Sequence, residues 1–178
     1  MVKQLSLGAA VALAAGCATT PDTPAERDGL EQRAVATLDI MKARDPSLAP
    51  VLDDAVGYAV FPEIGKGGAI VGGAYGHGVV FQHGRPVGFV ELSQASIGAQ
   101  LGGQTFAELI VLRDQAALDR LKSDNLDLGA DASAVALTSG GGRGVQFEDG
   151  VAVFVMPRGG LMVDISVHGQ KIDFSGRG

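Results

Sequence analysis

At 178 residues the chain has room for one domain with a sizeable core and a short appended segment. A composition of 46% hydrophobic and 19% charged residues excludes an intrinsically disordered chain. The formal net charge of −6 and the lack of tryptophan argue against a nucleic-acid-binding protein, because such a chain has neither a long-range attraction to phosphate nor an aromatic surface for base stacking.

The N-terminal residues have the pattern of an export signal. Lys3 gives a positive start, and the apolar run from Leu5 to Ala15 is too short to cross a hydrocarbon layer of ~30 Å as a permanent helix. Small residues then precede Cys17, the single cysteine of the chain, and this resembles the lipobox of bacterial lipoproteins. In that family the cysteine is acylated and becomes the first residue of the mature protein. The alternative is an ordinary secretory signal in which Cys17 has no role.

We therefore expect a signal peptide at residues 1–16, a tether at residues 17–23 and a domain at residues 24–178. Acyl chains on Cys17 would anchor the protein in a membrane of the bacterial cell envelope, since each buried CH₂ contributes ~0.8 kcal/mol. Ala18, rather than an aspartate, follows the cysteine. By resemblance to known sorting signals, this favours the outer membrane, with the domain facing the periplasm.

A long helix is expected to open the domain. Thr23-Pro24-Ala25-Glu26 is a capping box with proline at the first helical position, and Asp45-Pro46 would end the helix after Arg44. Its apolar residues recur at spacings of four and three, at Leu30, Ala34, Leu38 and Met41. This stripe indicates a helix that packs on the domain core, while a helix lying on a membrane, the alternative, usually has a more basic polar face. A second short helix is expected from Ser47 to Ala55.

The signals from residue 57 onward are mostly those of strands, with one helix at Gln115–Lys122 that Asp114 caps. The expected strands include Gly68–Ala74, Val79–Gln82, Val87–Ser93, Ser96–Gly102, Leu128–Leu137, Val145–Glu148 and Leu161–Val167. Asp149-Gly150 and His168-Gly169 are typical hairpin turns. The sequence thus predicts an α+β domain with a helical part (24–56) and a β-rich part (57–178). Its antiparallel sheet is strongly bent or barrel-like, with about 9–10 short strands, two N-terminal helices and one inserted helix.

The stretch from Phe61 to Phe81 carries a glycine-rich motif, F-P-x-x-x-K-x-G followed by G-G-x-Y-G-x-G. Glycine at these positions allows close approach of another backbone or a ligand. The motif resembles the signature of the SYLF family, a group of lipid-binding domains. Further blocks follow in the family's order, S-x-G-x-Q-x-G at Ser96–Gly102 and G-x-D at Gly129–Asp131. The resemblance covers roughly residues 48–174 and departs at Leu126, where the family often has a tryptophan that is a candidate for contact with the membrane.

The resemblance implies a membrane-anchored module that binds acidic phospholipids. For an exported bacterial domain these are phosphatidic acid, phosphatidylglycerol or cardiolipin, and the actin bundling of some fungal members is not carried over. A close variant is a carrier whose curved sheet encloses an acyl chain. The alternative is an envelope scaffold that binds a protein partner, with the lipid serving only as an anchor.

Basic residues next to glycines or turns are the candidate headgroup ligands, because flexible glycines let backbone N–H groups converge on an anion. The candidates are Lys66, Gly67, Gly68, Arg85, Arg143 (in the loop Gly140–Gly144), Arg158 and Lys171. The alternative interpretations are a solvated turn lysine for Lys66 and a flexible loop around Arg143.

Catalysis, metal binding and nucleotide binding find little support, and we expect neither an enzyme nor a cofactor. An active site could pair His77 with Glu91 or Glu108 and with Ser93 or Ser96, but the sequence has no G-x-S-x-G motif. The three histidines lack the spacing of a zinc site, and no phosphate-binding loop motif is present.

Overall fold

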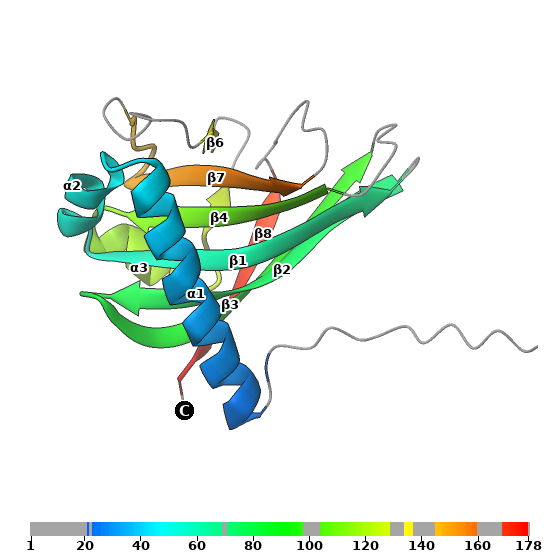
Figure 1. Ribbon diagram of the computed structural model, residues 1–178, viewed down its shortest axis with the longest axis horizontal. Coiled ribbons are helices and arrows are strands. Elements are labelled where there is room, and N and C mark those ends of the chain that lie inside the picture. The colour runs from blue at the N-terminus through cyan, green and yellow to red at the C-terminus, as the bar shows by residue number, and fades with distance from the viewer. Residues whose placement is uncertain are drawn as a thin grey trace, which may run out of the picture.

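The computed structural model describes residue 21 and residues 23–68, 71–97, 104–128, 134–136, 145–159 and 169–177. Two helices come first, α1 (Pro24–Arg44) and α2 (Leu48–Asp53), and α3 (Gln115–Lys122) is inserted between strands (Figure 1). The strands are β1 (Gly57–Gly68), β2 (Val71–Gln82), β3 (Arg85–Ile97), β4 (Gln104–Leu112), β5 (Asp127–Leu128), β6 (Ala134–Ala136), β7 (Val151–Gly159) and β8 (Gln170–Gly176). The predicted α+β class, with two N-terminal helices and one inserted helix, is confirmed.

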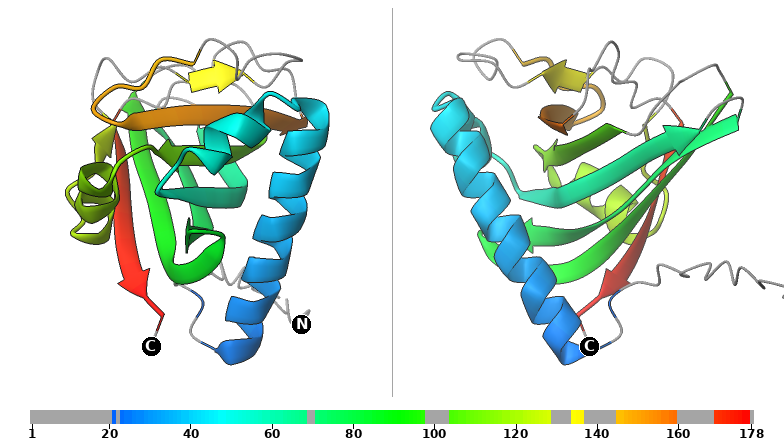
Figure 2. Two further views of the ribbon diagram at one scale, coloured as in Figure 1. Left: turned by 90° about the vertical axis from the view of Figure 1, so that its left-hand side faces the viewer. Right: turned by 45° about the vertical axis from the view of Figure 1, so that its right-hand side comes forward.

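The eight described strands form one open sheet in the order β5-β8-β3-β2-β1-β4-β7-β6, antiparallel except for the pair β6 and β7. The sheet is strongly bent, as predicted (Figure 2). Gln170 Nε2 on β8 donates to Glu108 Oε2 on β4 at 3.0 Å, although β3, β2 and β1 lie between these strands in the sheet. The sheet therefore has a concave face, here called the inner face, and a convex outer face.

Strands β1, β2 and β3 are longer than predicted, and β1 extends the expected strand Tyr58–Phe61 to Gly57–Gly68. Residues 71–74 of the expected strand Gly68–Ala74 join Val79–Gln82 in β2, whereas Gly68 ends β1. Val87–Ser93 joins the first residues of Ser96–Gly102 in β3. Glycines inside β2 do not interrupt it, because inner-face side chains of β1 occupy the space above them. A Cβ on Gly76 would lie 2.8 Å from Ile64 Cγ1, and one on Gly78 would lie 2.8 Å from a ring carbon of Phe61.

Two predicted strands are wrong. Leu128–Leu137 is not one strand, because Leu128 ends β5 while residues 134–136 form β6, and these strands lie at opposite edges of the sheet. Val145–Glu148 is not a strand either, since Glu148 alone pairs, with Val151, across the Asp149-Gly150 turn. Positive φ values of 48° and 78° at this turn match the predicted hairpin geometry. The expected strand Leu161–Val167 lies outside the described residues.

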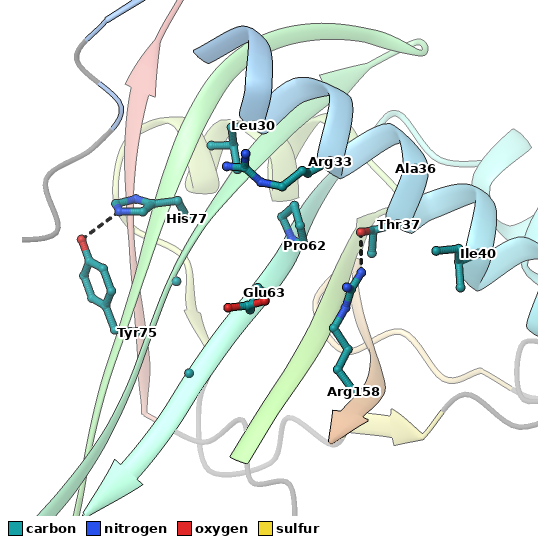
Figure 3. A pocket seen from close by; sticks show the side chains of 12 residues that line it. Leu30, Arg33, Ala36, Thr37, Ile40, Pro62, Glu63, Tyr75, His77 and Arg158 are labelled. Carbon is teal, nitrogen blue, oxygen red and sulfur yellow. Dashed lines mark hydrogen bonds between the residues drawn. The ribbon is translucent and has the colours of Figure 1, made fainter. Parts of the chain in front are cut away.

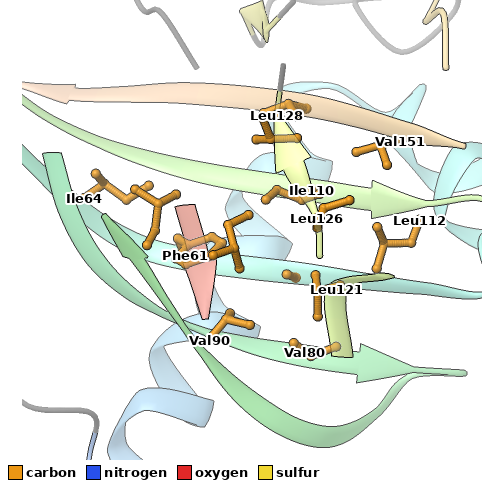
Figure 4. Packing of buried hydrophobic residues seen from close by; sticks show 14 of the residues in the cluster. Phe61, Ile64, Val80, Val90, Ile110, Leu112, Leu121, Leu126, Leu128 and Val151 are labelled. Carbon is orange, nitrogen blue, oxygen red and sulfur yellow. The ribbon is translucent and has the colours of Figure 1, made fainter. Parts of the chain in front are cut away.

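Each face of the sheet buries its own apolar cluster. On the inner face, Phe61, Ile64 and Ile110 pack with Leu118 and Leu121 of α3 (Figure 4). Leu126, at the position where the SYLF family often has tryptophan, is 5% exposed and belongs to this inner cluster. On the outer face, α1 covers part of the sheet (Figure 1).

The sequence places α1 correctly. Both hydrogen bonds of the predicted capping box, between Thr23 and Glu26, are present, and the helix ends at Arg44. The stripe Leu30, Ala34, Leu38 and Met41 is buried in the outer cluster, so its prediction as a core-facing stripe is confirmed. Among the described helices, none combines the length and apolar character needed to cross a membrane.

Candidate functional site

A groove of about 580 Å³ lies between α1 and the outer face of β1 and β2 (Figure 3). Its lining residues are Leu30, Arg33, Ala36, Thr37, Ile40, Pro62, Glu63, Gly65, Tyr75, Gly76, His77 and Arg158. We call it the helix–sheet groove. A hollow of about 450 Å³ shares Leu30, Arg33 and His77 with it and reaches Pro21 and Ala25 at the start of α1.

The glycine-rich signature stretch supplies half of the lining residues of the helix–sheet groove. Pro62 lies where the register of β1 shifts against both neighbouring strands, between Val60 and Ile64. Proline has no N–H to donate to the ladder, and such an irregularity bends a strand and redirects its side chains. Beyond it Gly65 presents bare backbone, because a Cβ there would meet nothing within 4 Å.

Two arginines bring positive charge to the groove from distant parts of the chain. Arg33 comes from α1, and Arg158, near the end of β7, donates from Nη2 to Thr37 Oγ1 at 2.8 Å. Neither guanidinium forms an ion pair with another described residue. Against these two cations the lining contains one carboxylate, Glu63. The groove is therefore locally basic on a chain whose formal charge is −6.

Tyr75 and His77 form a neutral polar wall. Burial and a hydrogen bond to Glu91 raise the pKa of Tyr75 to about 12, and Tyr75 Oη lies 3.1 Å from His77 Nε2. A carboxylate only accepts, so the tyrosine O–H donates to Glu91 and the His77 Nε2–H donates to the tyrosine oxygen. Burial lowers the pKa of His77, with partial opposition from Glu91, so the imidazole is neutral at pH 7.

The hydrolase arrangement considered from the sequence is only partly assembled. His77 pairs in register with Glu91, but its Nε2 is engaged by Tyr75 rather than by a serine hydroxyl. Glu108 belongs to the inner cluster side of the sheet and bonds Gln170, whereas His77 lines the outer groove. The described residues contain no group of three or more His, Cys, Asp or Glu side chains placed to hold a metal ion.

Lys66 does not lie in a turn, and most of its side chain is buried. It lies in β1, 5% exposed, on the face that Ile64 and Ala74 share, so it points to the inner side of the sheet. The amides of Gly65 and Lys66 pair with strands on both sides, which leaves them less free to converge on an anion than a loop would. Gly67 is exposed on the outer side, and Gly68 ends the strand.

The other predicted basic residues do not form one patch. Arg85 pairs with Gln82, eight positions along β2 from the partner of Lys66, or about 26 Å at ~3.3 Å per residue. Lys171 is exposed and forms an ion pair with Asp173. Arg158 is the one predicted cation among the described residues that lines the groove. Arg143 and Cys17 lie outside the described residues.

The sequence-based prediction missed Arg33 as a site residue. A usable signal existed, because Arg33 directly precedes the buried Ala34 and lies three residues after Leu30, at the edge of the predicted stripe. A cation at that edge lies next to the surface on which the helix packs.

The chain is similar to a known domain family and to a curated bacterial protein. Residues 93–176, from β3 to β8, match the family model Ysc84, described as Las17-binding protein actin regulator. Beta cell expansion factor A of Aeromonas veronii is 25% identical over 129 residues, which cover 71% of this chain and 48% of that protein. The chain thus spans about half the length of this curated relative.

Proposed function

Because the chain carries a SYLF (Ysc84) domain, we propose that it is a non-enzymatic phospholipid-binding module of the bacterial cell envelope. In this proposal the helix–sheet groove holds the headgroup of an acidic phospholipid such as phosphatidic acid, phosphatidylglycerol or cardiolipin. The observation that carries the proposal is the pairing of two arginines with an apolar wall in one groove.

The arginines suit a phosphate group. A guanidinium presents several N–H donors in a planar fork, and its hydrogen bonds to phosphate are charge-assisted. Thr37, which is 2% exposed, accepts from Arg158 and so holds one guanidinium in position before the ligand arrives. Arg33 reaches the same groove from the preceding turn of α1. A phosphate between the two would complete their hydrogen bonding.

The apolar lining suits the part of the lipid next to the phosphate. Leu30, Ala36, Ile40 and Pro62 line the groove, and Ile40 is 49% exposed at its rim. Each methylene that such a surface buries contributes ~0.8 kcal/mol. An acyl chain leaving the headgroup would therefore gain from contact with the exposed side chain of Ile40.

An acylated Cys17 would keep the groove near the bilayer. Residues 17–23 span at most roughly 25 Å when fully extended. Pro21 and Ala25, at the end of this tether, line the hollow that adjoins the groove. In this proposal the anchor lies in the outer membrane and the domain faces the periplasm, so that the tether brings the groove repeatedly to the lipid surface.

The alternative is an envelope scaffold that binds a protein partner. It draws support from the net charge of −6 and from the description of the matched family, which names binding to a protein, Las17. In that case the lipid serves only as an anchor, and the groove accepts a protein segment.

Vesicle flotation of residues 18–178 separates the two. We expect binding to phosphatidylglycerol-containing vesicles and not to pure phosphatidylcholine, weakened by added salt. The double variant Arg33→Glu/Arg158→Glu should bind at least about tenfold more weakly, since each charge-assisted hydrogen bond contributes ~1.5 kcal/mol or more.

For each single variant, Arg33→Glu or Arg158→Glu, the matched control is Arg85→Glu, the same charge change on an exposed residue at the far end of β2 and β3. It should bind as the unchanged protein does. Equal loss in the control would mean that net charge, not the groove, governs binding. No binding of the unchanged protein to any vesicle would move the scaffold function to first place.

A further inference from the structure

One side chain that lines the helix–sheet groove has a ring nitrogen without a hydrogen-bond partner. His77 Nδ1 is shielded from water and makes no hydrogen bond with any described residue. A shielded polar atom destabilises the protein unless a partner reaches it. His77 lines both the helix–sheet groove and the smaller hollow at the start of α1, which we call the N-terminal hollow. A ligand bound there can supply the partner.

The hydrogen bonds on the other side of the ring determine which nitrogen carries the proton. Glu91 accepts from the hydroxyl of Tyr75, and the tyrosine oxygen lies 3.1 Å from His77 Nε2 (Figure 3). Because the tyrosine has a single proton to donate, its oxygen accepts from the Nε2–H of His77. Burial lowers the pKa of His77, with partial opposition from Glu91, so Nδ1 carries no proton at pH 7. Nδ1 is therefore an acceptor, and it binds only a group that donates.

The N-terminal hollow, of about 450 Å³, adds a second acceptor and a cation. Glu26, in the first turn of α1, lines it with a carboxylate, which only accepts. Arg33 lines it as well, and a Cβ built on Gly29 would lie 3.5 Å from Arg33 Nη1, so the guanidinium lies back along the helix. A ligand that suits these groups has an anion for Arg33 and hydrogen-bond donors beside that anion.

A glycerol headgroup attached to a phosphate has both features. The phosphate suits the guanidinium groups of Arg33 and Arg158, and the glycerol hydroxyls next to it donate hydrogen bonds. An ammonium headgroup donates as well, but the two guanidinium groups would repel its charge. A carboxylate headgroup would face the acceptors His77 Nδ1 and Glu26 without a donor for them. The donors and acceptors of the hollow therefore favour a headgroup with neutral hydroxyls.

We propose that His77 determines the headgroup specificity of the groove, with its Nδ1 accepting a hydrogen bond from a hydroxyl of a glycerol headgroup that occupies the N-terminal hollow. This inference rests on the proposed function, because the arginines of the groove hold the phosphate of the same lipid. Arg33 lines both spaces together with the imidazole, and its long side chain would turn to the phosphate while the hydroxyl lies against Nδ1. The preferred lipid is then phosphatidylglycerol rather than an acidic lipid without headgroup hydroxyls.

Two lipids of equal charge separate recognition of the hydroxyl from recognition of the phosphate. Phosphatidylglycerol and phosphatidylmethanol both carry the charge of a phosphodiester, but the methyl headgroup has no hydrogen-bond donor. Soluble short-chain forms of both are titrated against the full chain by calorimetry. We expect a Kd about fivefold lower for phosphatidylglycerol, as for one hydrogen bond to a shielded acceptor. This comparison is made on the unchanged protein and needs no variant that folds.

His77→Phe removes the acceptor and keeps a flat ring. The variant should bind both lipids with the Kd that the unchanged protein has for phosphatidylmethanol, so that the ratio of the two Kd values falls to about one. Arg158→Gln is the comparison variant, because Arg158 lines the helix–sheet groove but not the N-terminal hollow. It should weaken binding of both lipids alike and keep the fivefold ratio. A merely structural histidine would behave as Arg158 does.

Three results would overturn the role of His77 and leave the proposed function standing. One is equal affinity of the unchanged protein for the two lipids. Another is a ratio that stays at about five in His77→Phe. The third is that short-chain phosphatidylethanolamine binds as tightly as phosphatidylglycerol, which would show that the donor is an ammonium. Binding of neither phosphatidylglycerol nor phosphatidylmethanol is a different result, since it would contradict the proposed function and this inference with it.

Discussion

At the scale of single residues, the side chain of Glu108 links stability to pH. The carboxyl is fully buried, and its pKa of about 7 lies above its ordinary value of 4.5. Between these two values the unfolded chain releases this proton while the folded protein keeps it. The unfolded state then binds fewer protons, so this group's contribution makes the folded protein less stable as pH rises from about 4.5 to about 7, by up to ~3 kcal/mol.

Glu108→Gln tests this dependence. Glutamine keeps an oxygen that accepts from Gln170 Nε2 and removes the charge that is costly to bury. At pH 8 we expect a Tm higher than that of the unchanged protein by roughly 5 °C, and at pH 4.5 little difference. Thermal unfolding of both proteins at the two pH values gives the comparison. An equal shift at both pH values would show that the carboxyl does not titrate in the core.

At the scale of the element, β1 has two glycines, Gly65 and Gly67, on its outer face, and no side chain packs against them. Gly65 and Gly67 have no atom within 4 Å of the place where a Cβ would stand, and neither has positive φ. Neither packing nor backbone conformation therefore requires glycine at these two positions. Gly65 lines the helix–sheet groove, and Gly67 lies two residues further along the same face.

Gly65→Val is expected to block the groove without harming the fold. Valine is favoured in strands and would point into open space, so Tm should stay equal or rise by a few degrees. Binding to phosphatidylglycerol vesicles should fall about tenfold, because the side chain takes the place of the lipid. Flotation and thermal unfolding of one sample measure both. Gly67→Val is the matched comparison, and loss of binding in it but not in Gly65→Val would move the site to the end of the strand.

Element boundaries that depend on local chemistry could be predicted from the sequence. The capping box at Thr23–Glu26 fixes the start of α1, and the turn Asp149-Gly150 has the positive φ values that its residue types allow. The continuity of β2 could not be predicted, because glycines that look like interruptions lie under Phe61 and Ile64 of a neighbouring strand. The split of residues 128–137 between β5 and β6 depends likewise on which strands pair across the sheet.

At the scale of the whole molecule, the candidate site forms between segments far apart in the chain. The hydrogen bond from Arg158 to Thr37 joins residues 121 positions apart, so no local sequence pattern predicts it. Arg158 could be proposed from its place beside a turn, whereas the inward direction of Lys66 follows from the register shift near Pro62. The sequence therefore identified the signature strands and one cation of the groove, and the fold was needed to bring Arg33 beside them.

Net acidity has a consequence for how the molecule would meet a membrane. A formal charge of −6 gives no long-range attraction to anionic lipid, so binding to a membrane would depend on the short-range contacts of the basic groove. In the proposed function the anchor supplies local concentration and the groove supplies selectivity for acidic headgroups.

The most direct test of the proposed function is nuclear magnetic resonance mapping of a soluble short-chain phosphatidylglycerol on residues 18–178. The amides that shift and saturate together should be those of Thr37, Gly65 and Tyr75, around the helix–sheet groove, with Gly84 and Arg85 unchanged. Saturating shifts centred on Gly84 and Arg85, or no saturable shifts at all, would contradict the assignment of the groove as the lipid site.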